Sequence, residues 1–137
     1  MRENKKVIVA IGSNYEQKDN VTFAKKQLKS ILGENSYFSQ EIWTRPVGIE
    51  SEDFLNCICI SKTHHNLKQL ESAFKRIERQ CQRCVKNDRE NKITLDIDIL
   101  QYGDDKFHMD DWQRDYVQQL LEDFEDDRQM FIIDPTL

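Results

Sequence analysis

The sequence lacks an apolar run long enough to cross a membrane. Charged residues make up 33% of its 137 residues, and the mean hydropathy is −0.77. A signal peptide pattern is also missing, because residues 1–6 are polar and only a short strand-like run begins at Val7. These absences exclude a membrane-spanning protein and favour a cytoplasmic one. The length fits a single domain over residues 1–137, with one core.

Two features of nucleotide-binding and nucleic-acid-binding proteins are absent as well. No G-x-x-x-x-G-K-[ST] motif occurs, which excludes the P-loop enzymes. The net charge is −5 rather than positive, and residues 104–128 hold ten acidic against three basic side chains. Such a region disfavours nucleic acid, while the mildly basic remainder can still bind a phosphate. We expect a solvated helix face here, with an acidic C-terminal extension over residues 122–137.

Cysteine is sparse, with four residues in the pairs Cys57-x-Cys59 and Cys81-x-x-Cys84. Two pairs are enough for a zinc site, but the first lies in a strand-like run, whereas structural zinc favours turns. We interpret Cys57 and Cys59 as buried, reduced thiols. The role of the second pair stays open. A zinc module is therefore kept as a third, weaker hypothesis for metal analysis to decide.

Glycine and proline are rare enough for most of them to mark a boundary, with four glycines and two prolines in the chain. Gly12 ends the run VIVAI, and Gly33 follows a helical pattern. Pro46 and Gly48 follow the run YFSQEIW, and Gly103 follows the run DIDIL. The segments between them can therefore be assigned separately.

Between these boundaries, apolar residues recur with helical or strand spacing. Helical stripes run over residues 24–32 and 67–81, and Asn66 is the predicted N-cap of the second, with Gln69 three residues later. A third helix is predicted over residues 112–124. The predicted strands cover residues 6–11, 36–44, 54–61 and 93–101.

The order of these elements is strand, helix, strand, strand, helix, strand, and then the third helix. This order is typical of a ferredoxin-like α+β sandwich, βαββαβ, with an antiparallel sheet and two helices on one side. The other side is expected to stay open for a ligand. RNA-binding domains share this fold, but they stack bases on aromatic residues of the central strands. The strand FLNCICIS, with carboxylates on a neighbouring strand, does not suit that function.

The strand ITLDIDIL carries two carboxylates on one face. Side chains alternate along a strand, so Asp96 and Asp98 point one way, and Ile93, Leu95, Ile97 and Ile99 point the other. Two charges about 7 Å apart in a partly dry site favour a cation between them. Oxygen ligands suit Mg²⁺ or Mn²⁺ better than zinc, and a nucleotide polyphosphate is the natural partner of Mg²⁺. The alternative is an amphipathic strand with a solvated face, although aspartate is a poor strand former.

Cations are frequent in the segment before this strand, and they are Arg79, Arg83, Lys86, Arg89 and Lys92. A loop that carries them can fold over bound phosphates. Three acidic residues, Glu78, Asp88 and Glu90, partly balance their charge. A soluble surface loop is therefore an equal alternative when the segment is taken alone.

Five short motifs, in this order and spacing, resemble those of one enzyme family. They are AIGSN (10–14), RPVG (45–48), DFLN (53–56), IE (77–78) and TLDIDIL (94–100). Over residues 7–103 the sequence is similar to the 6-hydroxymethyl-7,8-dihydropterin pyrophosphokinases of folate biosynthesis. The resemblance implies the ferredoxin-like fold and a magnesium-dependent transfer of pyrophosphate from ATP to the hydroxymethyl oxygen of the pterin, releasing AMP.

The same resemblance implies roles for individual residues. Asp96 and Asp98 are expected to hold two Mg²⁺ ions, while Arg83 and Arg89 close on the phosphates as further catalytic residues. The implied ATP contacts are Glu78, Lys86, Ile99, His108 and Arg114. The implied pterin contacts are Thr44, Pro46, Val47, Phe54, Asn56 and Tyr116, the last standing where the family has a stacking phenylalanine. Asn56 is expected to read the amide edge of the pterin.

Departures from the family pattern support a second hypothesis. Ile93 stands where the family has an arginine, and Glu90, Asn91 and Lys92 replace its Trp-Gly-Pro. Loss of a phosphate-clamping arginine can cost orders of magnitude in rate. The alternative is a divergent paralogue that binds pterin or nucleotide without efficient turnover. For either function we expect a monomer that works on small molecules, with no nucleic-acid or membrane partner.

Overall fold

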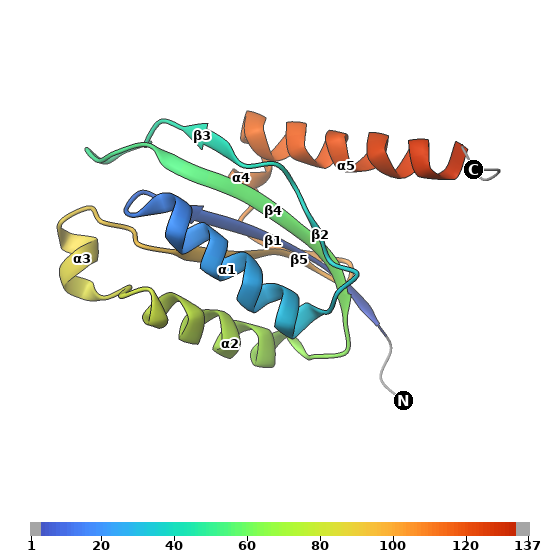
Figure 1. Ribbon diagram of the computed structural model, residues 1–137, viewed down its shortest axis with the longest axis horizontal. Coiled ribbons are helices and arrows are strands. Elements are labelled where there is room, and N and C mark those ends of the chain that lie inside the picture. The colour runs from blue at the N-terminus through green and yellow to red at the C-terminus, as the bar shows by residue number, and fades with distance from the viewer. Residues whose placement is uncertain (1–3, 134–137) are drawn as a thin grey trace.

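The computed structural model, which describes residues 4–133, is built on one antiparallel sheet (Figure 1). Its strand order is β2-β4-β1-β5-β6, and β3 also pairs with β4. The strands are β1 (Lys5–Ser13), β2 (Tyr37–Phe38), β3 (Ile42–Thr44), β4 (Phe54–Thr63), β5 (Asp96–Tyr102) and β6 (Asp105–Lys106). The helices are α1 (Gln17–Leu32), α2 (Leu67–Gln80), α3 (Val85–Arg89), α4 (Met109–Trp112) and α5 (Asp115–Ile133). This arrangement is the predicted α+β sandwich with a C-terminal helix.

Helices α1 and α2 lie side by side over one face of the sheet (Figure 1). Their apolar stripes share one core cluster with the inward residues of the central strands, such as Val9, Cys57 and Ile97. Helix α2 begins where predicted, because Asn66 and Gln69 each donate a backbone N–H to the other's side chain at 2.8 Å. The predicted apolar face of β5 therefore packs against the helices.

The opposite face of the sheet is largely covered by α5, so the prediction of an open face was wrong for this part of the sheet. Ile8, Ile58 and Leu100 are buried against Val117 and Leu120 of the helix. The central strands are apolar on both faces, and exposing such residues costs about 25 cal/mol per Å² of apolar surface. A cavity remains beside the start of α5, at the carboxylates of β5.

Two predicted strands have different limits because side chains replace backbone partners. Residues 36–44 form two short strands, β2 and β3, and between them the Ser39 hydroxyl accepts the Ile58 N–H at 2.8 Å. The last strand begins at Asp96 rather than residue 93. The Asn14 side chain accepts the Ile93 N–H at 2.7 Å, and the Asn14 N–H donates to the Ile93 carbonyl at 3.0 Å.

The helix predicted over residues 112–124 is two helices, the short α4 and the longer α5. The acidic extension predicted over residues 122–137 begins inside α5, and its residues 134–137 lie outside the described part of the chain. In the described part, no helix combines the length and apolar character needed to cross a membrane.

The four cysteines are free thiols in different surroundings. Cys57 and Cys59 are fully buried on β4, Cys81 is buried and Cys84 is exposed. Burial raises the pKa of Cys57 and of Cys59 to about 12, and it also raises the pKa of Cys81. Among residues 4–127, no metal-ligating group of three or more side chains includes a cysteine. These observations favour buried thiols over the zinc module.

We expect Cys84 alone to react quickly with a disulfide reagent in the native protein at about pH 8, because only the thiolate attacks. Cys57 and Cys59 are protonated at that pH, and their thiolate fraction grows only as the pH rises toward about 12. The measurement is a thiol count over time, native and denatured. A Cys84→Ser variant should lose the fast phase. Fast reaction of three or more native thiols would contradict the buried placement.

Candidate functional site

Asp96 and Asp98 line a cavity of about 160 Å³ on the sheet face opposite α1 and α2. Gly12 and Ala10 of β1 stand beside them in the register of the sheet. These small residues leave room next to the carboxylates, and a Cβ atom on Gly12 would lie 3.1 Å from Asn56 Oδ1. The two aspartates therefore share a face, and their surroundings keep that face accessible.

The pair of carboxylates perturbs the protonation of Asp98. Burial, the charge of Asp96 and a hydrogen bond with Asp96 raise the pKa of Asp98 to about 8, and Asp111 adds to the effect. Two such groups share a proton near neutral pH unless a cation takes its place. The electrostatics of the cavity thus favour a bound cation.

Asp98 also belongs to a group of side chains whose ligand atoms lie close together. One ligand atom each of Asp98, His108 and Asp111 lies within 4.8 Å of the other two. His108 Nε2 is 3.8 Å from Asp98 Oδ1, and Arg114 Nε is 3.2 Å from Asp111 Oδ1. Carboxylate oxygens dominate this donor set, which suits a hard cation such as Mg²⁺.

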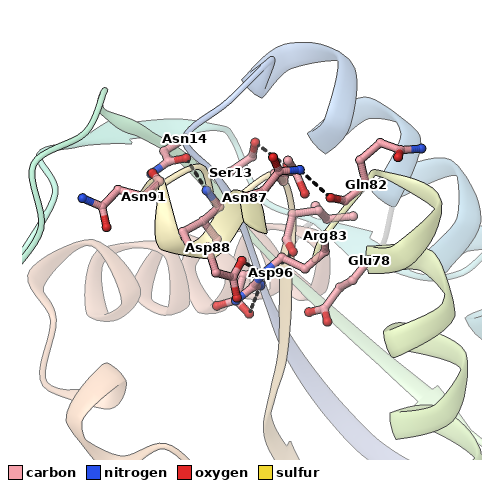
Figure 2. Close-up of polar contacts among 12 residues, drawn as sticks. Ser13, Asn14, Glu78, Gln82, Arg83, Asn87, Asp88, Asn91 and Asp96 are labelled. Atoms are coloured by element: carbon pink, nitrogen blue, oxygen red, sulfur yellow. Dashed lines mark hydrogen bonds and ion pairs between the residues drawn. The ribbon is translucent and has the colours of Figure 1, made fainter. Parts of the chain in front are cut away.

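Arg83 reaches Asp96 from the segment that follows α2 (Figure 2). Its Nε and Nη2 donate to Asp88 Oδ1 and Oδ2 at 2.6 and 3.2 Å. Its Nη1 donates to Asp96 Oδ1 at 3.3 Å and to the Leu95 carbonyl at 3.1 Å. A cation of the protein therefore already touches one carboxylate of the pair.

Asn56 is the buried polar residue of the cavity, at 6% exposure. Its Nδ2 donates to Thr44 Oγ1 at 2.7 Å, and also to the Ile42 and Phe54 carbonyls at 3.3 Å. The amide is thus fixed with its oxygen toward the cavity side of Gly12. The apolar walls are Val47, Ile49, Phe54 and the ring of Tyr116. This is a small slot with aromatic walls and one fixed amide.

The profile of one protein family matches residues 8–126, and the family is described as 7,8-dihydro-6-hydroxymethylpterin-pyrophosphokinase. The chain belongs to this family. The predicted family and its ferredoxin-like fold are confirmed by the match. The activity of this family is pyrophosphoryl transfer from ATP to hydroxymethyldihydropterin in folate synthesis. A search of curated proteins gave no match.

A second, larger cavity of about 630 Å³ adjoins the slot in this pyrophosphokinase. Asp98 lines both cavities. The larger one combines the apolar residues Phe74, Ile99 and Phe107 with His108 and basic side chains. Its volume is in the range of small-molecule sites. Two cavities of different size thus meet at one carboxylate.

The predicted site residues of the pyrophosphokinase divide into those that line a cavity and those that do not. The smaller cavity is lined by Thr44, Val47, Phe54, Asn56, Asp96, Asp98, Arg114 and Tyr116. The larger is lined by Asp98, Ile99 and His108. Neither is lined by Pro46, Glu78, Arg83, Lys86 or Arg89.

The residues outside the cavities have other positions. Lys86 and Arg89 are exposed on α3. Glu78 is buried, its Oε2 accepts the Ile97 N–H at 2.8 Å, and burial raises its pKa. It therefore ties α2 to β5 directly behind the aspartates.

Sequence reasoning missed two charged residues of the smaller cavity, Arg45 and Asp111. Arg45 lies inside the RPVG motif and forms no hydrogen bond or ion pair with any described residue. Asp111 was assigned to a solvated acidic face. The signal that was available is its place between His108 and Arg114, both predicted contacts.

Proposed function

We propose that the smaller cavity binds the pterin, the larger one binds the adenosine of ATP, and the pyrophosphoryl group is transferred between them beside Asp98. The observation that carries this proposal is the position of Asp98, which lines both spaces. Reactive groups that are held next to each other gain most of the advantage of an intramolecular reaction.

The carboxylates of Asp96 and Asp98 are the proposed ligands of two Mg²⁺ ions. Their crowding and oxygen chemistry support this assignment. When bound, the ions supply neutralising charge to the triphosphate. Asp111 and His108 complete the polar surroundings. Arg114, paired with Asp111, is one nearby protein cation for the transferred phosphates.

Asn56 is proposed to recognise the pterin. Its Nδ2 is occupied by protein acceptors, so its Oδ1 is the atom left to accept an N–H from the pterin edge. Phe54 and Tyr116 line the same cavity and are the proposed apolar faces for a flat ring, and Thr44 and Val47 also line it. Burial raises the pKa of Tyr116 to about 12, so its ring stays neutral. Pro46 is proposed as a backbone contact of the pterin.

On the nucleotide side, Ile99 and His108 are proposed as direct contacts, with Glu78 behind them. Arg83, Lys86 and Arg89 are proposed to approach the phosphates when residues 82–92 close over the site, which also excludes water. The exposure of Lys86 and Arg89 leaves both free to move toward a ligand.

Binding without efficient turnover is the competing function, and Ile93 supports it. The cavity nevertheless contains an arginine without a protein partner among the described residues, Arg45. Arg45 supplies part of the positive charge that is missing because residue 93 is isoleucine and not arginine. We therefore favour the active enzyme.

The test is AMP release from ATP and Mg²⁺, with and without the dihydropterin alcohol. We expect AMP to appear only when the pterin is present, because the acceptor hydroxyl completes the site. Binding of either ligand in a protein that releases no AMP would support the paralogue without turnover. Pterin-independent AMP release would contradict the two-cavity assignment.

We also propose that residues 1–137 act as one domain, as a cytoplasmic monomer with only small-molecule partners. Analytical ultracentrifugation with and without ATP tests the monomer directly.

A further inference from the structure

The contact between Arg83 and Asp96 is controlled by a third residue, Asp88. A guanidinium has one side-on edge, formed by Nε and Nη2, that matches both oxygens of a carboxylate. Asp88 occupies that edge at 2.6 and 3.2 Å. Asp96 receives one longer contact, from Nη1 at 3.3 Å, and Nη1 also donates to the Leu95 carbonyl at 3.1 Å.

Hydrogen bonds between asparagine side chains and backbone carbonyls hold the segment that contains Asp88 (Figure 2). It lies on α3, where the Asn87 side chain donates to the Gln82 carbonyl at 2.7 Å. Beyond the helix, the Asn14 side chain donates to the Asn91 carbonyl at 2.8 Å. The first bond lies within the segment and the second ties its far end to Asn14, so the Asp88 carboxylate has a defined position relative to Arg83.

Without Asp88, the carboxylate closest to Arg83 is that of Asp96. The side chain of Arg83 is only 24% exposed, so its charge is not fully stabilised by water and needs a protein anion. A side-on pair with Asp96 would cover both oxygens that a metal ion needs. Arg83 would then compete with Mg²⁺ for Asp96.

We propose that Asp88 is a positioning residue of the metal site: it retains the side-on edge of Arg83 and so keeps the Asp96 carboxylate open to a divalent cation. The proposal rests on the proposed role of Asp96 in metal binding. It concerns a residue that lines neither cavity and acts through Arg83.

The test is a titration with Mn²⁺ alone, without nucleotide, in which free Mn²⁺ is followed by its electron paramagnetic resonance signal. We expect Asp88→Asn to weaken Mn²⁺ binding about fivefold, the size of a typical coupling between contacting charges. Asp88→Glu keeps the bidentate partner and should restore binding to within about twofold. The matched control is Glu90→Gln, which removes a charge of similar exposure, 45% against 41%, from the same segment.

A double-mutant cycle separates the contact from the simple loss of a negative charge. In an Arg83→Met background there is no guanidinium to release, so Asp88→Asn should cost no more than Glu90→Gln. An equal cost in both backgrounds, or unchanged Mn²⁺ binding in Asp88→Asn, would overturn the proposal. Asp96→Asn identifies the level at which a failure lies. If that variant binds Mn²⁺ like the parent protein, the proposed metal site is wrong; if it loses binding while Asp88→Asn does not, only the role of Asp88 is wrong.

Discussion

Asp98→Asn is expected to reduce pyrophosphoryl transfer at least about a thousandfold, because the variant loses a charged ligand at the point where both cavities meet. Asp96→Asn should have a similar effect. An amide keeps the shape of the side chain and removes only its charge, so the fold should be unchanged. The measurements are AMP release, Mn²⁺ binding and thermal unfolding of each variant.

The matched control for these substitutions is Asp110→Asn. Asp110 is an exposed carboxylate on α4, and it lines neither cavity. Its loss should change the rate by less than about twofold. Unchanged rate and Mn²⁺ affinity in both Asp96→Asn and Asp98→Asn would exclude the metal assignment, whereas unfolding of either variant would point to a structural role instead.

Leu120→Ala should lower the free energy of unfolding by about 3 kcal/mol, within the usual range for a leucine in a packed core. Leu120 is fully buried between α5 and the sheet, in the cluster with Ile58 and Leu100. Urea denaturation measures the change. Tyr116 belongs to the first turn of the same helix, so weaker pterin binding should accompany the loss of stability.

Gln119→Ala is the control for the helix itself, since Gln119 is exposed and its side chain donates, among the described residues, only to Asp123 across one turn. It should change stability by less than about 0.5 kcal/mol. If Leu120→Ala costs no more than this control, then α5 does not contribute to the core, and the second face of the sheet is less tightly covered than the structure indicates.

Features with a local cause could be predicted from the sequence. The period of two along β5 places Asp96 and Asp98 on one face, and the capping box of Asn66 depends on residues three positions apart. The family motifs extended this to the two substrates. In each case the determining residues are neighbours in the chain or belong to a motif with a fixed spacing.

Features that depend on distant residues could not be predicted in this way. The alternation along β5 does not show which segment covers the second face, although the continuous apolar run of residues 7–11 indicates that both faces are buried. The strand β5 begins at Asp96 and not at Ile93 because the Ile93 N–H is bonded to Asn14, which lies 79 residues away in the sequence. Arg45 and Asp111 enter the site only because the fold brings a strand end and a short helix to the same cavity.

Under the proposed assignment of one substrate to each cavity, the sharing of Asp98 has a thermodynamic consequence. A ligand in one space alters the charge and position of a group that the other space also contacts. Linkage then requires that if ATP changes the affinity for the pterin by some factor, the pterin changes the affinity for ATP by that same factor. Any such coupling therefore has the same size whichever substrate binds first.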